Sequence, residues 1–198
     1  MKIGPKYKIC RRLGEGVFPQ CGTTKFSISG SSQRGPKTGR RRRGPSEYGR
    51  QLLEKQKARY TYGISENQFS NYVKKHHQPA TLFSALESRL DNVVFRSGLA
   101  LSRLAARQIV NHGHIMVNGR RLSIPSYLVK VGDKITIRSQ SLGKGIFQDL
   151  DERLKDYTVP GWIENSSKGE YSILAQPLTG EAELNLDFPS IIDFYSRV

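Results

Sequence analysis

Apolar positions in the first part of the chain recur at helical spacing, and residues typical of helix ends bound each stretch. Ser46 precedes a periodic stretch that Gly63 ends, so we expect a helix with one strongly basic face between them. Ser65 stands three residues before Gln68, the spacing of a capping box. This spacing predicts a short second helix that ends near His76.

Two further helices are predicted in the middle of the chain. The first begins at Thr81 and is closed by Gly98, and the second follows Ser102, a suitable N-cap residue, and ends at Gly113. The apolar face of the first of these helices consists of Leu82, Leu86, Leu90, Val93 and Val94.

The pattern then changes from helical spacing to alternation. Asn118-Gly119 lies between alternating apolar residues, which is the strongest short signal for a β-hairpin. Further strand signals cover residues 127–131 and 135–137. Residues 86–138 are therefore predicted to form two helices followed by a small, twisted sheet.

From residue 139 onwards the pattern is mixed. We expect a short helix over 146–154, a strand over 171–174 and an apolar end, 191–195, that packs rather than frays. The predicted fold class is α+β, with an N-terminal helical domain, a basic extended arm, a helix-helix-small-β-sheet module and a short mixed C-terminal segment. The predicted boundaries are 1–45 for the basic extension, 46–85 for the helical domain, 86–150 for the module and 151–198 for the C-terminal segment.

Charge is distributed unevenly along the chain. Its 198 residues include 32 Lys and Arg against 17 Asp and Glu, a net charge of +15. Residues 1–60 hold 16 basic and 3 acidic side chains, whereas residues 141–198 hold 5 and 10. A basic excess at one end is typical of a protein that binds nucleic acid or an anionic membrane. A membrane is disfavoured because residues 33–45 have no apolar face and the chain lacks both a run of about 18 apolar residues and a signal-like segment. We therefore expect a soluble protein that is not secreted.

Residues 26–45 are rich in Ser, Gly and Arg and lack periodicity, so we expect them to stay extended until they meet a polyanion. A solvated tail and a localisation signal are both compatible with this composition. Arginine forks, however, bind phosphate and stack on bases, which favours an arm that orders on RNA. The arginines predicted to bind there are Arg40, Arg41, Arg42 and Arg43.

Cys10 and Cys21 are too few for a disulfide framework in a chain of this length, which is typical of a reducing compartment. Neither belongs to a Cys-x-x-Cys pair and the histidines lie far downstream, so the four ligands of a structural zinc are not present locally. The sequence also lacks the GxGxxG, P-loop and HExxH patterns. We expect no metal, no cofactor, no small-molecule substrate and no enzyme activity.

Several segments resemble the RNA-binding module named after the fourth protein of the small ribosomal subunit. The segments are ESRLDNVVFRSG at 87–98, ARQIVNHGHIMVNGR at 106–120, IPSY at 124–127 and VGD at 131–133. Flanking matches extend the resemblance to the ribosomal protein family itself: GPK at 4–6, RRLG at 11–14, LEKQK at 53–57, YG at 62–63 and FYSR at 194–197.

The resemblance implies a bacterial-type or organellar small-subunit ribosomal protein. Such a protein binds small-subunit rRNA directly and early in assembly, lies near the point where mRNA enters the subunit beside the third and fifth proteins of that subunit, and supports the fidelity of translation. It is expected in the ribosome, in the cytoplasm or in the matrix or stroma of an organelle. Some relatives carry a four-cysteine zinc knuckle, from which this sequence departs. A non-ribosomal RNA-binding or translational regulatory protein remains the alternative.

Four arginines of the module are expected to share one face. Arg89 and Arg96 project from one predicted helix, and Arg103 and Arg107, four residues apart, project from the next. Helix–hairpin packing would gather them on a concave surface that fits a folded RNA backbone, with Asp91 orienting an arginine. The resemblance carries rRNA binding over onto Arg89, Asn92, Arg96, Ser102, Arg103, Arg107, Gln108, His112, His114, Asn118 and Arg120.

Some of these residues have structural readings as well. His112 and His114 follow a helix, where a dipole partner or a packed ring competes with RNA contact, and Asn118-Gly119 suits a turn that needs positive φ. In the helical domain, tyrosines interleave with basic residues, a pattern that fits either stacking on bases or core packing. The residues predicted to bind rRNA in that domain are Tyr48, Arg50, Lys55, Lys57 and Arg59.

Overall fold

The computed structural model describes residues 3–14, 16–22, 46–155, 157–167, 169–179 and 186–197. The chain divides into two compact units, of which the first comprises Met1–Pro79 and Leu184–Val198 and the second Ala80–Glu183. The predicted arm from Arg40 to Arg43 lies outside the described residues. Among the helices that are described, none is long and apolar enough to cross a membrane.

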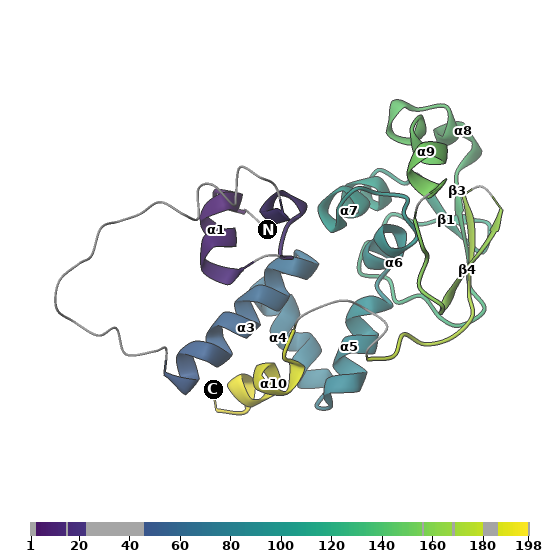
Figure 1. Cartoon of the computed structure of the whole chain (residues 1–198). Coiled ribbons are helices and arrows are strands. Elements are labelled where there is room, and N and C mark those ends of the chain that lie inside the picture. The colour runs from purple at the N-terminus through teal and green to yellow at the C-terminus, as the bar shows by residue number, and fades with distance from the viewer. Residues whose placement is uncertain are drawn as a thin grey trace. The chain divides into compact units, whose positions relative to one another are not determined.

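The first unit is helical, as predicted (Figure 1). The Ser46 hydroxyl accepts a hydrogen bond from the amide of Gly49 at the start of the first long helix, and Gly63 ends that helix in the left-handed conformation. Ser65 and Gln68 form the predicted capping box of the next helix. The elements of this unit are α1 (Lys6–Leu13), the 3₁₀ helix η1 (Pro19–Gly22), α3 (Glu47–Tyr62), α4 (Glu66–Lys75) and α10 (Phe188–Ser196).

The last helix of the chain, α10, lies against α3 (Figure 1). The Asp187 carboxylate caps α10 by accepting from the amide of Ser190 at 3.1 Å, and Phe188, Ile191 and Phe194 are buried. The apolar end of the chain is thus packed, as the sequence predicted, because burying these side chains removes apolar surface from water.

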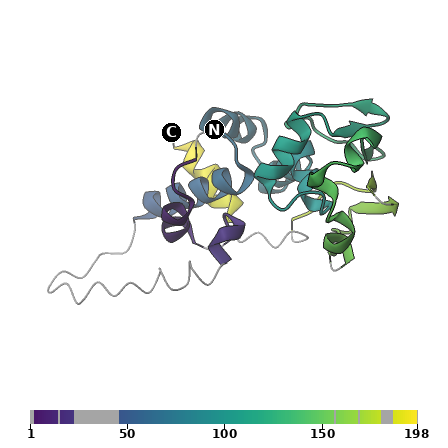
Figure 2. The same cartoon turned by 90° about the horizontal axis from the view of Figure 1, so that it is seen from above.

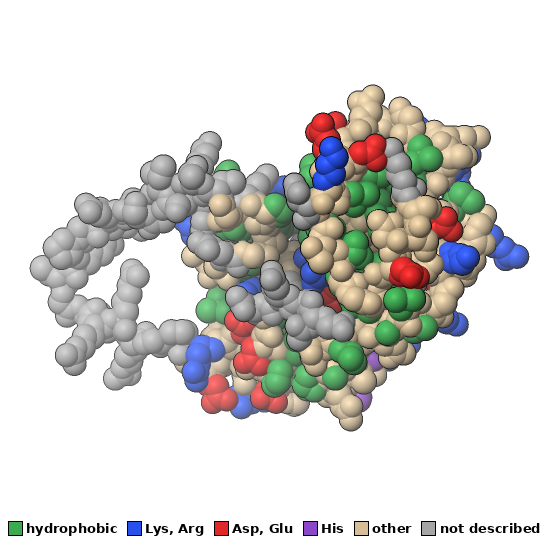
Figure 3. Space-filling model, turned by 45° about the vertical axis from the view of Figure 1, so that its right-hand side comes forward, with side chains coloured by type: hydrophobic (Ala, Val, Ile, Leu, Met, Phe, Trp, Pro, Cys, Tyr) green, Lys and Arg blue, Asp and Glu red, His purple; other side chains and the backbone are tan. Residues whose placement is uncertain are grey.

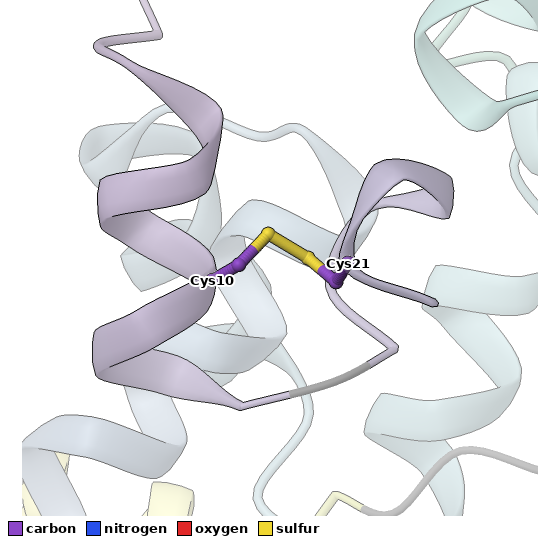
Figure 4. The surroundings of a disulfide bond; sticks show 2 residues. All are labelled: Cys10 and Cys21. Carbon is purple, nitrogen blue, oxygen red and sulfur yellow. A yellow bond between two sulfur atoms is a disulfide. The ribbon is translucent and has the colours of Figure 1, made fainter. Parts of the chain in front are cut away.

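A disulfide joins Cys10 of α1 to Cys21 of η1, with the two Cα atoms 5.7 Å apart (Figure 4). Both cysteines are buried. The bond contradicts the expectation of two reduced cysteines, which rested on their small number and not on their positions. The fold returns the chain after α1 and so brings together two residues that are 11 positions apart. The disulfide thereby fixes α1 to η1.

The second unit begins with two helices, α5 (Pro79–Glu87) and α6 (Leu90–Arg96), where one helix over residues 81–98 was predicted. That prediction is wrong because Arg89 adopts an extended conformation, with φ −66° and ψ 138°. Arg89 forms an isolated β-bridge with Leu128, and the amide of Leu90 donates to the carbonyl of Tyr127 at 2.8 Å. Long-range hydrogen bonds therefore break the helix although its apolar periodicity continues.

Two other predicted elements also differ from the structure. Residues 127–131 were predicted to form a strand and do not. This segment forms backbone hydrogen bonds with the residues just before α6 instead of joining the sheet, and its one β-bridge pairs Leu128 with Arg89. The helix predicted over 146–154 is replaced by the 3₁₀ helix η2 (Gly145–Phe147) and α9 (Leu150–Lys155), which follow a short α8 (Ser139–Leu142).

The predicted helix and hairpin after Ser102 are confirmed. The Ser102 hydroxyl accepts from the amide of Ala105 at 3.2 Å and so caps α7 (Arg103–Asn111). Strand β1 (Ile115–Val117) then pairs with β2 (Arg120–Arg121). The turn between them has positive φ at both central residues, 50° at Asn118 and 75° at Gly119. Only a type I′ turn requires this, and Asn-Gly is its preferred pair.

The sheet of the second unit has five antiparallel strands in the order β2-β1-β3-β5-β4. Figure 2 shows strands of this unit as arrows, teal for the earlier part of the chain and yellow-green for the later part. The remaining strands of the sheet are β3 (Lys134–Ile137), β4 (Ile163–Ser167) and β5 (Glu170–Ile173). The two strands beyond β3 thus both come from residues after 160. The predicted boundary at 150/151 falls inside this unit. The helical first unit and this sheet confirm the α+β class.

Helices α6 and α7 and the sheet of the second unit share one apolar core. Because both helices bury their apolar faces in it, their polar faces and the arginines on them are held in fixed positions. The helices contribute Leu90, Val93, Val94, Ile109 and Val110 to this core, and the strands contribute Ile115, Ile135, Ile163, Tyr171 and Ile173.

Candidate nucleic-acid interface

The described basic side chains are mixed with acidic ones, and Figure 3 shows both kinds interspersed on the face that it presents. The second unit contains a connected group of arginines and carboxylates, which we call the arginine cluster. It is built from the end of α5, the break before α6, α6 itself and the first half of α7. Its members are Glu87, Arg89, Asp91, Asn92, Arg96, Arg103 and Arg107.

One half of the cluster is centred on Asp91. The guanidinium of Arg89 donates to both carboxylate oxygens, from Nε to Oδ1 at 3.0 Å and from Nη2 to Oδ2 at 2.9 Å. Arg107 donates from Nε and Nη2 to Oδ2 at 2.9 and 2.7 Å. The side chains of Arg89 and Asp91 are 2% and 4% exposed, whereas that of Arg107 is 21% exposed. Arg89 therefore anchors Asp91, and Asp91 in turn orients Arg107 at the surface.

The other half is centred on Glu87, which is 1% exposed. Its Oε2 accepts from Nδ2 of Asn92 at 2.8 Å and from Nε of Arg96 at 2.9 Å. Nε of Arg103 donates to Oδ1 of Asn92 at 2.6 Å, and its guanidinium lies 4.6 Å from the centre of the Phe95 ring. Hydrogen bonds and ring contact thus hold both arginines in fixed orientations.

The cluster carries four guanidinium groups and two carboxylates, so its net charge is +2. A buried carboxylate without cationic partners is costly, which explains why each is surrounded by arginines. The two positive charges in excess attract an anion, and the exposed edges of Arg96, Arg103 and Arg107 are where a phosphate group can reach them. Arg89 and Asn92, each 2% exposed, have a positioning role in this geometry.

The other predicted residues of the module fall into two groups. Gln108, His112 and Arg120 are exposed around the cluster and the hairpin. Ser102 caps α7, and the Asn118 side chain ties the hairpin to Asp133 and to the amide of Lys134. These two side chains are engaged within the fold.

His114 is buried. Its Nδ1 lies 2.9 Å from the hydroxyl of Ser141, and its ring meets the ring of Phe147 edge-on. Burial lowers the pKa of His114 below the usual 6.5, and the nearby charge of Lys144 acts in the same direction. A neutral, packed imidazole is therefore the state that this site favours.

In the first unit, Glu66 binds two of the residues that were predicted to contact rRNA, Lys55 and Arg59. Lys55, which is buried, donates to Oε1 at 2.8 Å, and Arg59 donates to Oε2 at 3.1 Å. The hydroxyl of Tyr195 donates to Oε1 at 2.7 Å. Burial alone would raise the pKa of Glu66, but the hydrogen bonds from Lys55 and Tyr195 and the charges of Lys55 and Arg59 outweigh it and hold the pKa below 4.5. Lys55 and Arg59 thus bind α3 to α4 and α10.

The three remaining predicted residues of α3 lie nearer the surface. Arg50 is exposed, and Nζ of Lys57 lies 3.8 Å from Glu54. Tyr48 is exposed, with its ring centre 5.4 Å from that of Phe194. The structure therefore places these side chains where a ligand can touch them.

Glu87 and Glu66, which organise the two networks, were not singled out from the sequence. Glu87 pairs with Arg96, nine residues away and across the break before α6, so no helical spacing links them. Glu66, on α4, pairs with side chains of two other helices, Lys55 and Arg59 of α3 and Tyr195 of α10. In the described part of the chain, no three His, Cys, Asp or Glu side chains are grouped as metal ligands would be.

Comparison of the sequence with known proteins identifies a family. Residues 1–91 match the ribosomal protein S4/S9 N-terminal domain, and residues 88–135, which include most of the arginine cluster, match the S4 domain. The chain is 42% identical to the small ribosomal subunit protein uS4 of Halothermothrix orenii over 203 residues, and 42% identical to that of Natranaerobius thermophilus over 207. It is 43% identical to the uS4 protein of Roseiflexus castenholzii over 205 residues. Each comparison covers 98% of both chains. The chain therefore belongs to the family of small ribosomal subunit proteins uS4.

Proposed function

We propose that this protein is a structural constituent of the small ribosomal subunit that binds small-subunit rRNA directly and early in assembly. It lies near the point where mRNA enters the subunit, beside the third and fifth proteins of that subunit, and supports the fidelity of translation there. Its place is the ribosome, in the cytoplasm of a bacterium or in an organelle. Its role is structural rather than enzymatic.

The observation that carries this proposal is the half-neutralised arginine cluster. Two buried carboxylates fix four arginines, so the guanidinium groups are already oriented before RNA arrives and little side-chain entropy is lost on binding. Folded RNA is recognised largely through the shape and charge of its backbone, for which a rigid set of arginine forks is suited.

Different residues have different roles in the proposed interface. Arg89, Asn92, Ser102, His114 and Asn118 position the binding surface from within the fold. In the first unit, Lys55 and Arg59 position α3, and Tyr48, Arg50 and Lys57 contact the RNA. The arginines 40–43, which lie outside the described residues, are proposed to bind RNA as well. In the second unit, the contacting residues are Arg96, Arg103, Arg107, Gln108, His112 and Arg120.

Binding of the purified chain to naked small-subunit rRNA, in competition with tRNA and duplex DNA across a salt series, tests the proposal. We expect a strong preference for rRNA that survives physiological salt. Equal binding to all three polyanions, lost as salt rises, would refute specific rRNA binding, because counterion release alone acts on any polyanion.

Sedimentation of cell extracts separates the ribosomal role from that of a free regulator. A ribosomal protein co-sediments with small subunits through moderate salt. Recovery of the chain only in light fractions would refute the ribosomal role and favour a regulatory RNA-binding protein.

A further inference from the structure

A small cavity lies between α1 and α3 in the first unit. Its volume is about 220 Å³, which corresponds to roughly seven water molecules at about 30 Å³ each. This is below the usual range for drug-sized ligands and suits a single flat group. The lining residues are Ile9, Arg12 and Leu13 of α1 and Leu52, Gln56, Arg59 and Tyr60 of α3.

The lining combines apolar walls with hydrogen-bond donors. Ile9, Leu13 and Leu52 are only partly buried, so apolar surface stays open to solvent inside the cavity. Arg12 is exposed at its edge, and no acidic side chain is among the lining residues. A ligand for this cavity must therefore have a flat apolar part and an anionic part.

Arg59 provides a donor that the fold does not use. Its Nη1 donates to Glu66 at 3.1 Å, and its guanidinium lies 4.8 Å from the centre of the Tyr60 ring. Its Nε is buried and has no hydrogen-bond partner among the described residues. A buried donor without a partner is rare in native structures because its desolvation is not compensated, and an acceptor on a ligand would supply that partner.

The walls of the cavity are held in place from both sides. The disulfide between Cys10 and Cys21 ties α1 to η1, and Phe18, which directly precedes η1, lies edge-on against Tyr60 at 6.3 Å between ring centres. Arg59 is fixed by Glu66. The cavity is therefore preformed, which lowers the entropic cost of binding.

We propose that this cavity, the α1–α3 pocket, binds one unstacked nucleotide of the rRNA. The base lies between the apolar walls and Tyr60, with its polar edge toward Gln56 and Nε of Arg59, and the phosphate meets Arg12. Sequence-specific RNA recognition acts mainly on unstacked bases that are held by aromatic or arginine faces and by hydrogen bonds at their edges, and the pocket offers all of these. The inference rests on the proposed function, since it names a subsite of the same rRNA interface.

Titration of the full chain with AMP, adenosine and inorganic phosphate, followed by methyl NMR, tests the pocket. We expect AMP to bind saturably and to shift the methyl signals of Ile9, Leu13 and Leu52, with adenosine weaker than AMP. Arg12→Ala should weaken AMP binding by about tenfold, since it removes one hydrogen bond to a charged group. Arg12 is exposed, so its loss leaves the fold intact.

Arg11→Ala is the matched control because it removes the same charge from the neighbouring, exposed position of α1, which does not line the pocket. Equal loss of AMP binding in the two variants would overturn the proposal, and so would inorganic phosphate that shifts the same methyl signals as strongly as AMP. The Arg12→Ala variant should likewise bind rRNA more weakly than the Arg11→Ala variant. Specific rRNA binding with no difference between the variants overturns the pocket alone, whereas absence of any rRNA preference in the unmodified chain overturns the proposed function.

Discussion

Replacing Arg103 and Arg107 together by alanine tests the arginine cluster directly. Both side chains emerge from α7 and are 13% and 21% exposed, more than the 2% of Arg89 in the same cluster. The fold should tolerate the change, because Asp91 keeps Arg89 as its partner and Glu87 keeps Asn92 and Arg96. The variant therefore removes charge from the surface and leaves the buried half of each network intact.

The expected magnitude follows from the charges in the cluster. Four guanidinium groups and two carboxylates give +2, and removing two arginines brings the cluster to zero. Each lost phosphate contact lowers the slope of log affinity against log salt by roughly 0.7 to 0.9, so the double variant should flatten the slope by about 1.4 to 1.8. Affinity at low salt falls most, because the lost term is electrostatic.

The assay is equilibrium binding to naked small-subunit rRNA over a salt series, with circular dichroism to confirm that the variant is folded. Lys144→Ala with Lys155→Ala is the control, since both lysines are exposed, lie in the same unit and contribute the same total charge from outside the cluster. An unchanged slope in the arginine variant would remove the cluster from the interface. An equal fall in the control would show that only total charge matters.

Three further predictions concern the Glu87 network, the Glu66 network and the disulfide. Glu87→Gln should lower the free energy of unfolding by about 3 kcal/mol, because arginines lose a buried carboxylate partner; urea denaturation measures this, and a loss no larger than that of the exposed control Glu164→Gln would contradict it. The pKa of Glu66 is lowered in the folded state, so the contribution of its carboxylate to stability is complete above pH 4.5 and is lost as the pH falls through the folded-state pKa. Glu66→Gln should therefore flatten the dependence of the free energy of unfolding on pH in that acidic window. An unchanged pH profile would contradict the role of the network. Cys10→Ser with Cys21→Ser should lower the free energy of unfolding by up to about 2.8 kcal/mol, which is the loop-closure entropy term for residues 11 apart. If the unmodified chain gives the same denaturation curve with and without reductant, the two sulfurs are not linked.

Local signals were sufficient where a few neighbouring residues determine the conformation. Ser46, Ser65 and Ser102 each cap a helix as predicted, because an N-cap hydroxyl and the amide it accepts from are three residues apart in the sequence. The Asn118-Gly119 turn was equally predictable, since the residues themselves select positive φ. The arginines of α7 were predicted to share a face for the same reason.

The tertiary structure decided which basic residues face outward. Arg89 and Arg96 look equivalent in the sequence. In the structure Arg89 is buried and paired with Asp91, whereas Arg96 is partly exposed at the surface. The difference arises because Leu128 holds Arg89 in an extended conformation and breaks the predicted helix. That partner is 39 positions away, so no local pattern reveals it.

The sequence by itself determined the capped helices that follow Ser46, Ser65 and Ser102, the hairpin, the basic character and the family to which the chain belongs. Only the tertiary structure decided that residues after 160 complete the sheet, that Cys10 and Cys21 meet, and that Glu87 and Glu66 organise the arginines and lysines around them. The physical reason is the range of the interactions. Caps and turns form between neighbours in the chain, whereas buried ion pairs, strand pairing and disulfides join residues that only the fold brings together.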